Sequence, residues 1–200
     1  HVVGPNRRAV RAPGVLVARV EDVRADGIVH NQRMHVDDLS LPIDVVSTSA
    51  SSLDVDTLVV PMFEGDVTPS VAGLGPVASR RVADVIASKE FTAKPGTLFV
   101  TPVDDEAWRP RHLILVGLGS RSSYTTDRSR RAATAAALAA RDRKQRSLAI
   151  LLCGASAAVD EVQVVAEGLT LAAYHSGSYK TDTESKPLSL TATIVIPEAT

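Results

Sequence analysis

The amino-acid sequence predicts an α/β fold, a three-layer α/β/α sandwich in which helices cover both faces of a mostly parallel or mixed sheet of about six strands. Six short stretches are almost continuously apolar rather than alternating between apolar and polar residues, which is typical of strands buried on both faces. Segments with helical periodicity lie between several of these stretches, as strand–helix–strand units of a parallel sheet require. The chain has 200 residues, of which 44% are hydrophobic and 22% charged. That composition is ordinary for a globular protein and supplies enough apolar material for one core.

The predicted strands are rich in valine, isoleucine and leucine, and β-branched residues favour extended backbone. They span residues 43–46, 57–63, 97–100, 112–116, 148–153 and 192–196. None approaches the ~20 apolar residues that a membrane-spanning helix needs, so we expect no membrane association.

Three helices are predicted between the strands. The first begins at Pro76, a residue suited to the first helical position, and carries apolar residues at helical spacing as far as Ile86. The second runs over 127–144 after Thr125 or Thr126, either of which could cap it, and its alanine-rich middle allows close packing on a sheet. The third runs over 158–175. Its apolar stripe consists of Val162, Val165, Ala166, Leu169 and Ala172.

Residues 1–42 are the least regular part of the chain. We interpret them as an N-terminal extension with a possible hairpin, in which a strand at 15–20 could pair with 28–29 across a turn at 25–27, followed by a linker at 37–42. Residues 43–197 form the predicted α/β domain.

The sequence offers no catalytic or metal-binding constellation. The five histidines include no H-E-x-x-H pair, and there is neither a C-x-x-C nor a G-x-S-x-G motif. The single cysteine, Cys153, excludes an intrachain disulfide and fits a reducing compartment. It follows an apolar run without charged neighbours, so we interpret it as a small buried hydrophobe. We therefore expect no catalytic residue, metal or cofactor in this chain.

One glycine-rich turn is a weak candidate for a phosphate or nucleotide site. Gly117, Gly119 and Ser120 follow a predicted strand and precede a helix, which resembles half of a dinucleotide fingerprint. The third glycine is missing, because position 122 is a serine, and the helix begins several residues late. A turn that needs glycine for a close approach of the backbone explains the same residues without a ligand.

Basic residues cluster on and after the second predicted helix, between positions 128 and 146. They are Arg128, Arg130, Arg131, Arg141, Arg143, Lys144 and Arg146. Such a face could contact DNA phosphates, although the net charge of the chain is −1 and no aromatic residues interleave with the basic ones. A solvated helix face is the alternative that we favour, so we expect no nucleic-acid partner.

Four segments, in order, resemble the N-terminal domain of the leucyl (cytosol) aminopeptidase family. They are Leu53–Gly65, Phe91–Thr97, His112–Gly119 with its V-G-L-G turn, and Ala166–Tyr174 followed by Tyr179 and Lys180. Each segment alone is weakly specific, but their order and spacing agree over residues 44–197. Ser176 and Gly177 depart from the family pattern, which often has an aromatic and an acidic residue there.

The resemblance implies a macro-domain-like fold and a role other than catalysis of the family's reaction. In this family, a second, C-terminal domain holds two divalent metals, zinc or manganese, which activate water to remove the N-terminal residue of peptides. The metal-binding Asn-Thr-Asp-Ala-Glu-Gly run of that domain is absent here, so no catalytic residue carries over. We expect a cytoplasmic assembly or regulatory domain that is inactive alone and whose partner is its own catalytic domain. The family forms hexamers mostly through catalytic domains, so an isolated N-terminal domain could be monomeric.

A macro-like fold also leaves a binding function as an alternative. Such folds often bind ADP-ribose at the carboxyl ends of the strands, where the candidate loops are 64–75 and 117–123. Glu64 and Asp66 stand where macro domains have asparagine and glycines, and two acids would repel a pyrophosphate.

Overall fold

The computed structural model describes residues 41–66, 75–104, 108–153, 159–173 and 190–196. The strand and hairpin predicted within residues 1–42 lie almost entirely outside the described residues. The division between an extension at 1–42 and a domain at 43–197 therefore stays a prediction.

Six strands form one sheet in the order β1-β6-β5-β2-β4-β3. Their bounds are β1 Ile43–Ser47, β2 Thr57–Phe63, β3 Leu98–Pro102, β4 His112–Gly119, β5 Ser147–Leu151 and β6 Thr191–Ile196. Every neighbouring pair is parallel except β3 and β4, which run antiparallel. The predicted mostly parallel sheet of six strands is confirmed.

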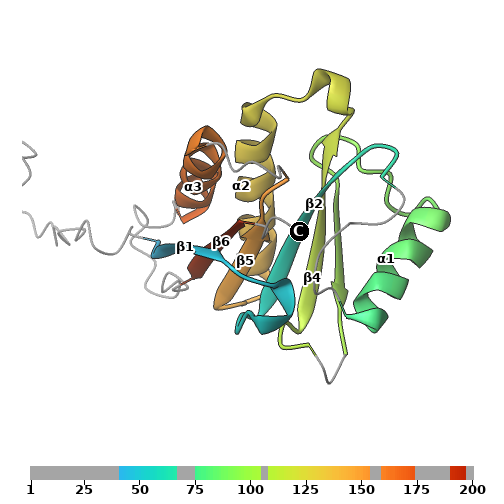
Figure 1. Ribbon diagram of the computed structural model, residues 1–200, viewed down its shortest axis with the longest axis horizontal. Coiled ribbons are helices and arrows are strands. Elements are labelled where there is room, and N and C mark those ends of the chain that lie inside the picture. The colour runs from blue at the N-terminus through green and yellow to red at the C-terminus, as the bar shows by residue number, and fades with distance from the viewer. Residues whose placement is uncertain (1–40, 67–74, 105–107, 154–158, 174–189, 197–200) are drawn as a thin grey trace, which may run out of the picture. The chain divides into compact units, whose positions relative to one another are not determined.

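In the described part of the chain, three α-helices cover the sheet: α1 Pro76–Ala87, α2 Thr126–Asp142 and α3 Val159–Ala173. Figure 1 shows α2 and α3 side by side on one face of the sheet and α1 on the other, which confirms the three-layer sandwich. Two short 3-10 turns, η2 (Ala50–Ser52) and η3 (Arg121–Ser123), lie in the connections. Helix α2 ends before the predicted Lys144, because that residue adopts a left-handed φ of 59°.

Two apolar clusters, one on each face, make up the core. Along β4 the side chains alternate between them, so that Leu113 and Leu115 pack on the α1 face while Ile114 and Val116 pack on the α2 and α3 face. All four are fully buried. This two-sided burial explains why the sequence shows continuous apolar runs instead of alternation.

Asp56 ties together the amino ends of three central strands. Its carboxylate Oδ2 accepts the backbone N–H groups of Arg146 (2.8 Å) and Ser147 (3.2 Å), and its own N–H donates to Ser147 Oγ at 2.8 Å. Its carbonyl accepts the N–H groups of Arg111 and His112 at 3.1 and 3.0 Å. One residue thus joins the start of β2 to the starts of β4 and β5.

Candidate functional site

Open α/β sheets usually bind ligands at the carboxyl ends of their strands, and here the ends of β2 and β4 meet in a cluster of side chains. Arg121 donates two hydrogen bonds to the carboxylate of Asp66, at 2.9 and 3.2 Å, and its guanidinium lies 4.2 Å from the ring centroid of Phe63. Asp66 also accepts the backbone N–H of Phe63 at 3.0 Å. The ring of Phe63 also contacts the ring of Tyr124 edge-to-face, with 5.3 Å between the two ring centroids. The side chains at the ends of β2 and β4 therefore contact one another.

A polar group beneath this cluster links the sheet to helices α2 and α3. The hydroxyl of Tyr124 lies 2.7 Å from Ser129 Oγ and donates to Glu161 at 3.4 Å. Glu161 is buried and also accepts the backbone N–H of Cys153 at 3.4 Å. Burial raises the pKa of Tyr124 above its usual value.

Cys153 lacks the properties of a nucleophile. Burial, and then the charge of Glu161, raise the pKa of its thiol to about 12. Because the thiolate is the reactive form, this raised pKa disfavours nucleophilic reaction of Cys153 near neutral pH.

Two of the three weak nucleotide candidates, Gly117 and Gly119, lie against the segment 93–97. Gly117 and Gly119 belong to β4 itself, so the strand continues beyond the predicted end at 116. The N–H of Gly117 donates to Thr97 O and that of Gly119 to Ala93 O, both at 2.9 Å. Ser120 Oγ lies 2.9 Å from Ser122 Oγ.

Glycine is required at Gly117 because the backbone of residues 93–97 approaches so closely. A Cβ atom there would lie 2.1 Å from the carbonyl oxygen of Lys94. Gly119 has a φ of +77°, which a side chain disfavours. With both N–H groups already bonded within the chain, these glycines have no donors to offer a phosphate.

A hollow of about 240 Å³ lies beside the end of β2, next to the described part of the candidate loop 64–75. Its described lining is mostly apolar and includes Phe63 and Phe91, and Asp66 is the one charged residue among the described lining residues. The described lining is an apolar wall with a carboxylate that Arg121 already pairs, so it offers a pyrophosphate no unpaired cation. The remainder of that loop, residues 67–74, lies outside the described residues.

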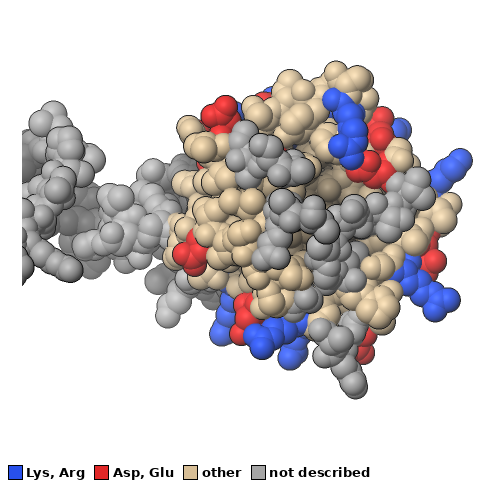
Figure 2. Space-filling view, viewed as in Figure 1, with Lys and Arg blue, Asp and Glu red and all other residues tan. Residues whose placement is uncertain are grey.

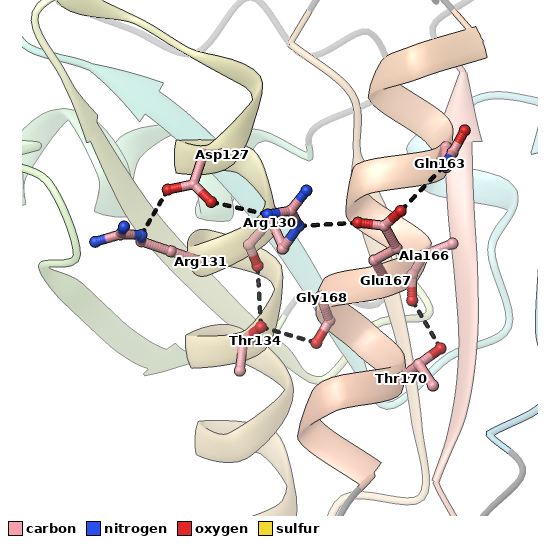
Figure 3. Close-up of polar contacts among 9 residues, drawn as sticks. All are labelled: Asp127, Arg130, Arg131, Thr134, Gln163, Ala166, Glu167, Gly168 and Thr170. Carbon is pink, nitrogen blue, oxygen red and sulfur yellow. Dashed lines mark hydrogen bonds and ion pairs between the residues drawn. The ribbon is translucent and has the colours of Figure 1, made fainter.

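Three residues of the basic cluster, Arg128, Arg130 and Arg141, contact α3 or the sheet. Arg130 bridges Asp127 and Glu167, at 2.9 and 3.0 Å, and Arg131 pairs with Asp127 at 2.7 Å (Figure 3). Arg128 and Arg141 donate to backbone carbonyl oxygens outside their own helix, those of Leu118 and Ala172. These contacts use Arg128, Arg130 and Arg141 to hold the fold together. The other members of the cluster are exposed, as on a solvated helix face: Arg131, Arg143, Lys144 and Arg146.

Close contact between α2 and α3 depends on a glycine. A Cβ at Gly168 would lie 2.3 Å from the carbonyl oxygen of Arg130. Thr134 Oγ1 reaches across to Gly168 O at 2.8 Å and also donates to Arg130 O at 3.0 Å (Figure 3). The alanine-rich sequence of α2 thus serves helix–helix contact in addition to the predicted packing on the sheet.

Charges of both signs are mixed on the surface. On the face shown in Figure 2, Lys and Arg lie near Asp and Glu around the margin, and no broad area of one sign forms. Among the described residues, no three His, Cys, Asp or Glu side chains gather in a way that could hold a metal ion. Over the same residues, no helix has the length and apolarity to cross a membrane.

Sequence reasoning missed the group formed by Phe63, Asp66, Arg121 and Tyr124. Asp66 and Arg121 are 55 positions apart, and a single sequence contains no signal for such a pair. Arg121 did lie within the candidate loop 117–123, but nothing local indicated that its partner was an acid of the chain itself.

Comparison with known proteins agrees with the resemblance noted in the sequence. Residues 59–183 match the family model described as the cytosol aminopeptidase family, N-terminal domain. A probable cytosol aminopeptidase of Trichormus variabilis is 34% identical over 136 residues, which cover 66% of this chain and 27% of that protein. One from Microcystis aeruginosa is 31% identical over 152 residues, covering 74% and 31%. The chain thus spans between a quarter and a third of the length of these relatives.

Solved structures share the fold. A tomato leucine aminopeptidase variant superposes with a TM-score of 0.59 at 17% identity, covering 83% of this chain and 34% of its own. The macrodomain of Mycobacterium tuberculosis DarG superposes with a TM-score of 0.56 at 14% identity, covering 78% and 98%. The predicted macro-like architecture is therefore confirmed. On the strength of the family match, this chain belongs to the cytosol aminopeptidase family, to whose N-terminal domain it corresponds.

Proposed function

We propose that this chain is the non-catalytic assembly or regulatory domain of a leucyl aminopeptidase-type metallo-exopeptidase, which removes N-terminal amino acids from peptides. The observation that carries the proposal is the match of residues 59–183 to the N-terminal domain of the family. The relatives are aminopeptidases of which the chain covers only 27% to 31%. Their remaining length has room for a separate catalytic domain.

The chemistry would then come from outside this chain. Two divalent metals, zinc or manganese, would sit in the C-terminal domain and activate water there. Among the described residues, no three His, Cys, Asp or Glu side chains gather as a metal site requires. The partner of this domain would be its own catalytic domain, within a cytoplasmic homo-hexamer.

A leucyl-anilide hydrolysis assay with manganese tests the proposal, run on this chain and on the full-length gene product side by side. We expect turnover from the full-length protein alone. Turnover by the isolated chain would overturn its non-catalytic role. Inactivity of both would indicate a family member that has lost the reaction.

Nucleotide binding, the alternative that the macro-like fold raises, has little support from the geometry. The N–H groups of Gly117 and Gly119 already donate to backbone carbonyl oxygens of the segment 93–97. The nearby hollow is lined by the carboxylate of Asp66. We therefore expect isothermal titration calorimetry with ADP-ribose to show no binding heat. A saturable signal that weakens in the Arg121→Ala variant would instead place a ligand at the carboxyl ends of β2 and β4.

A further inference from the structure

Among the described strands, β3 forms one edge of the sheet and pairs with β4 alone. Gly117 N–H donates to Thr97 O at 2.9 Å and Val103 N–H to Arg111 O at 2.8 Å. Hydrogen-bonded pairs alternate in an antiparallel ladder, so residues 97, 99, 101 and 103 turn their backbone groups toward β4. Leu98 and Val100 therefore direct their N–H and C=O groups outward. Within the described part of the chain these outward groups have no hydrogen-bond partner.

This edge lacks the protection that edge strands usually carry. Natural sheets protect their edges with charged residues, prolines or bulges, because an open edge recruits another strand. The sequence of β3 is Leu-Phe-Val-Thr-Pro, without a charge, and Leu98 is 37% exposed. Pro102 blocks only the last position. The opposite edge strand, β1, carries the exposed Asp44.

We propose that two copies of this chain pair antiparallel through β3, which joins their sheets into one. The strand is complementary to itself when Phe99 lies on the two-fold axis. Leu98 of each copy then faces Val100 of the other, and their outward N–H and C=O groups form four hydrogen bonds with none left over. Phe99 meets Phe99 of the second copy at a non-hydrogen-bonded position, where opposing side chains are closest.

The other face of the joined strands is apolar as well. Leu98 and Val100 point to the face opposite Phe99, because side chains alternate along a strand, so four aliphatic side chains would gather there. A register centred on Val100 is inferior. It would place Pro102, which has no N–H, opposite Leu98 and leave the Leu98 carbonyl without a donor.

The proposal depends on the sheet edge and is independent of any aminopeptidase function. It departs from the expectation that the isolated domain is monomeric. That expectation rested on assembly through the catalytic domains. An open, uncharged edge is a physical reason for this domain to associate by itself.

Sedimentation velocity of this chain over a dilution series tests the pairing. We expect the mass of two chains at high concentration and of one chain on dilution. Leu98→Lys should raise the dissociation constant at least ~10-fold, since a lysine at an edge opposes pairing. Val100→Pro should act likewise, because it removes an outward N–H and leaves the β3–β4 hydrogen bonds intact.

Val45→Lys is the matched control. Val45 is 49% exposed on the other edge strand, so this variant should keep the wild-type dissociation constant. Circular dichroism would verify that each variant folds. The mass of a single chain at every concentration would overturn the proposal, as would a dimer that survives both β3 substitutions or is lost in Val45→Lys.

Residue-resolved hydrogen exchange gives a second readout that needs no substitution. The amides of Leu98 and Val100 should exchange more slowly as concentration rises. Those of Phe99 and Thr101, already bonded to β4, should stay protected throughout. Equal exchange of the Leu98 and Val100 amides in concentrated and dilute samples would exclude β3 as the interface.

Discussion

At the scale of single residues, Gly117 shows how a glycine in a strand can serve the fold rather than a ligand. The segment 93–97 lies against β4 and donates and accepts hydrogen bonds with Gly117 and Gly119. Any side chain at Gly117 would push this segment away. The glycine pattern that resembles a nucleotide fingerprint is therefore explained by contact between two parts of the backbone.

Gly117→Ala should destabilise the protein by about 3 kcal/mol, because the new methyl group overlaps Lys94 O and disrupts the adjoining hydrogen bonds. Urea unfolding monitored by circular dichroism measures the loss. Gly96→Ala is the control. Its Cβ would meet nothing within 4 Å, and only the φ of +76° opposes it, so the cost should be about 1 kcal/mol. Equal costs at the two positions would contradict the close-approach explanation.

Cys153 should make the protein less stable at high pH. Its pKa is raised from 9.0 to about 12 in the folded state, so folding favours the protonated thiol. That contribution is complete below pH 9 and is lost as the pH rises from 9 toward 12, at up to about 1.4 kcal/mol per pH unit. The free energy of unfolding, measured between pH 8 and 10.5, should fall more steeply for the wild type than for Cys153→Ala. Parallel curves would show that the thiol titrates normally.

At the scale of elements, the pair α2 and α3 is held by contacts that only small residues permit. Gly168 lets the helices approach, and Thr134 and Arg130 then connect them by hydrogen bonds (Figure 3). Two arginines of the basic cluster, Arg130 and Arg141, belong to this interface. An isolated helical pattern cannot reveal this, because the partner acid Glu167 lies 37 positions away on another helix.

Gly168→Ala should cost about 3 kcal/mol, since the helices must separate to admit a methyl group 2.3 Å from Arg130 O. Thr170→Ala serves as the control on the same helix. Thr170 is exposed and bonds only to Ala166 O, so its replacement should change stability by less than about 0.5 kcal/mol. Thermal unfolding of the three proteins would measure both effects. A Gly168→Ala protein as stable as the wild type would mean that the helices do not pack this closely.

At the scale of the whole molecule, the sequence predicts the elements and their layered architecture, but not the order of the strands or the direction of a single strand. Runs such as Leu113–Val116 mark buried strands because both faces of the sheet are covered, and all six strands lie near their predicted positions. The sequence did not predict the extension of β4 through Gly119, because glycine is a weak strand former. The extension depends on hydrogen bonds with residues 93–97, which are distant in the sequence. The antiparallel direction of β3 likewise arises from long-range pairing.

At the candidate site, too, the sequence shows which residue types are present but not which side chains contact each other. Glycines and charges are visible in the sequence, whereas their pairing is a property of the folded chain. Arg121 becomes the partner of Asp66 only because β2 and β4 lie side by side. The family resemblance was recognisable because its four segments recur in order, independent of any three-dimensional reasoning.

The hydrogen bonds by which Asp56 joins the starts of β2, β4 and β5 have a consequence for how the chain folds during synthesis. The carboxylate of Asp56 accepts the backbone N–H of Arg146, which is synthesised 90 positions later. Strand β5, which follows Arg146, lies between β2 and β6 in the sheet. A ribosome adding about 5–20 residues each second needs several seconds to supply that stretch. Until then, β2 has an unoccupied flank. The nascent polypeptide is therefore exposed to mispairing during that interval, and slower translation before Ser147 would lengthen it.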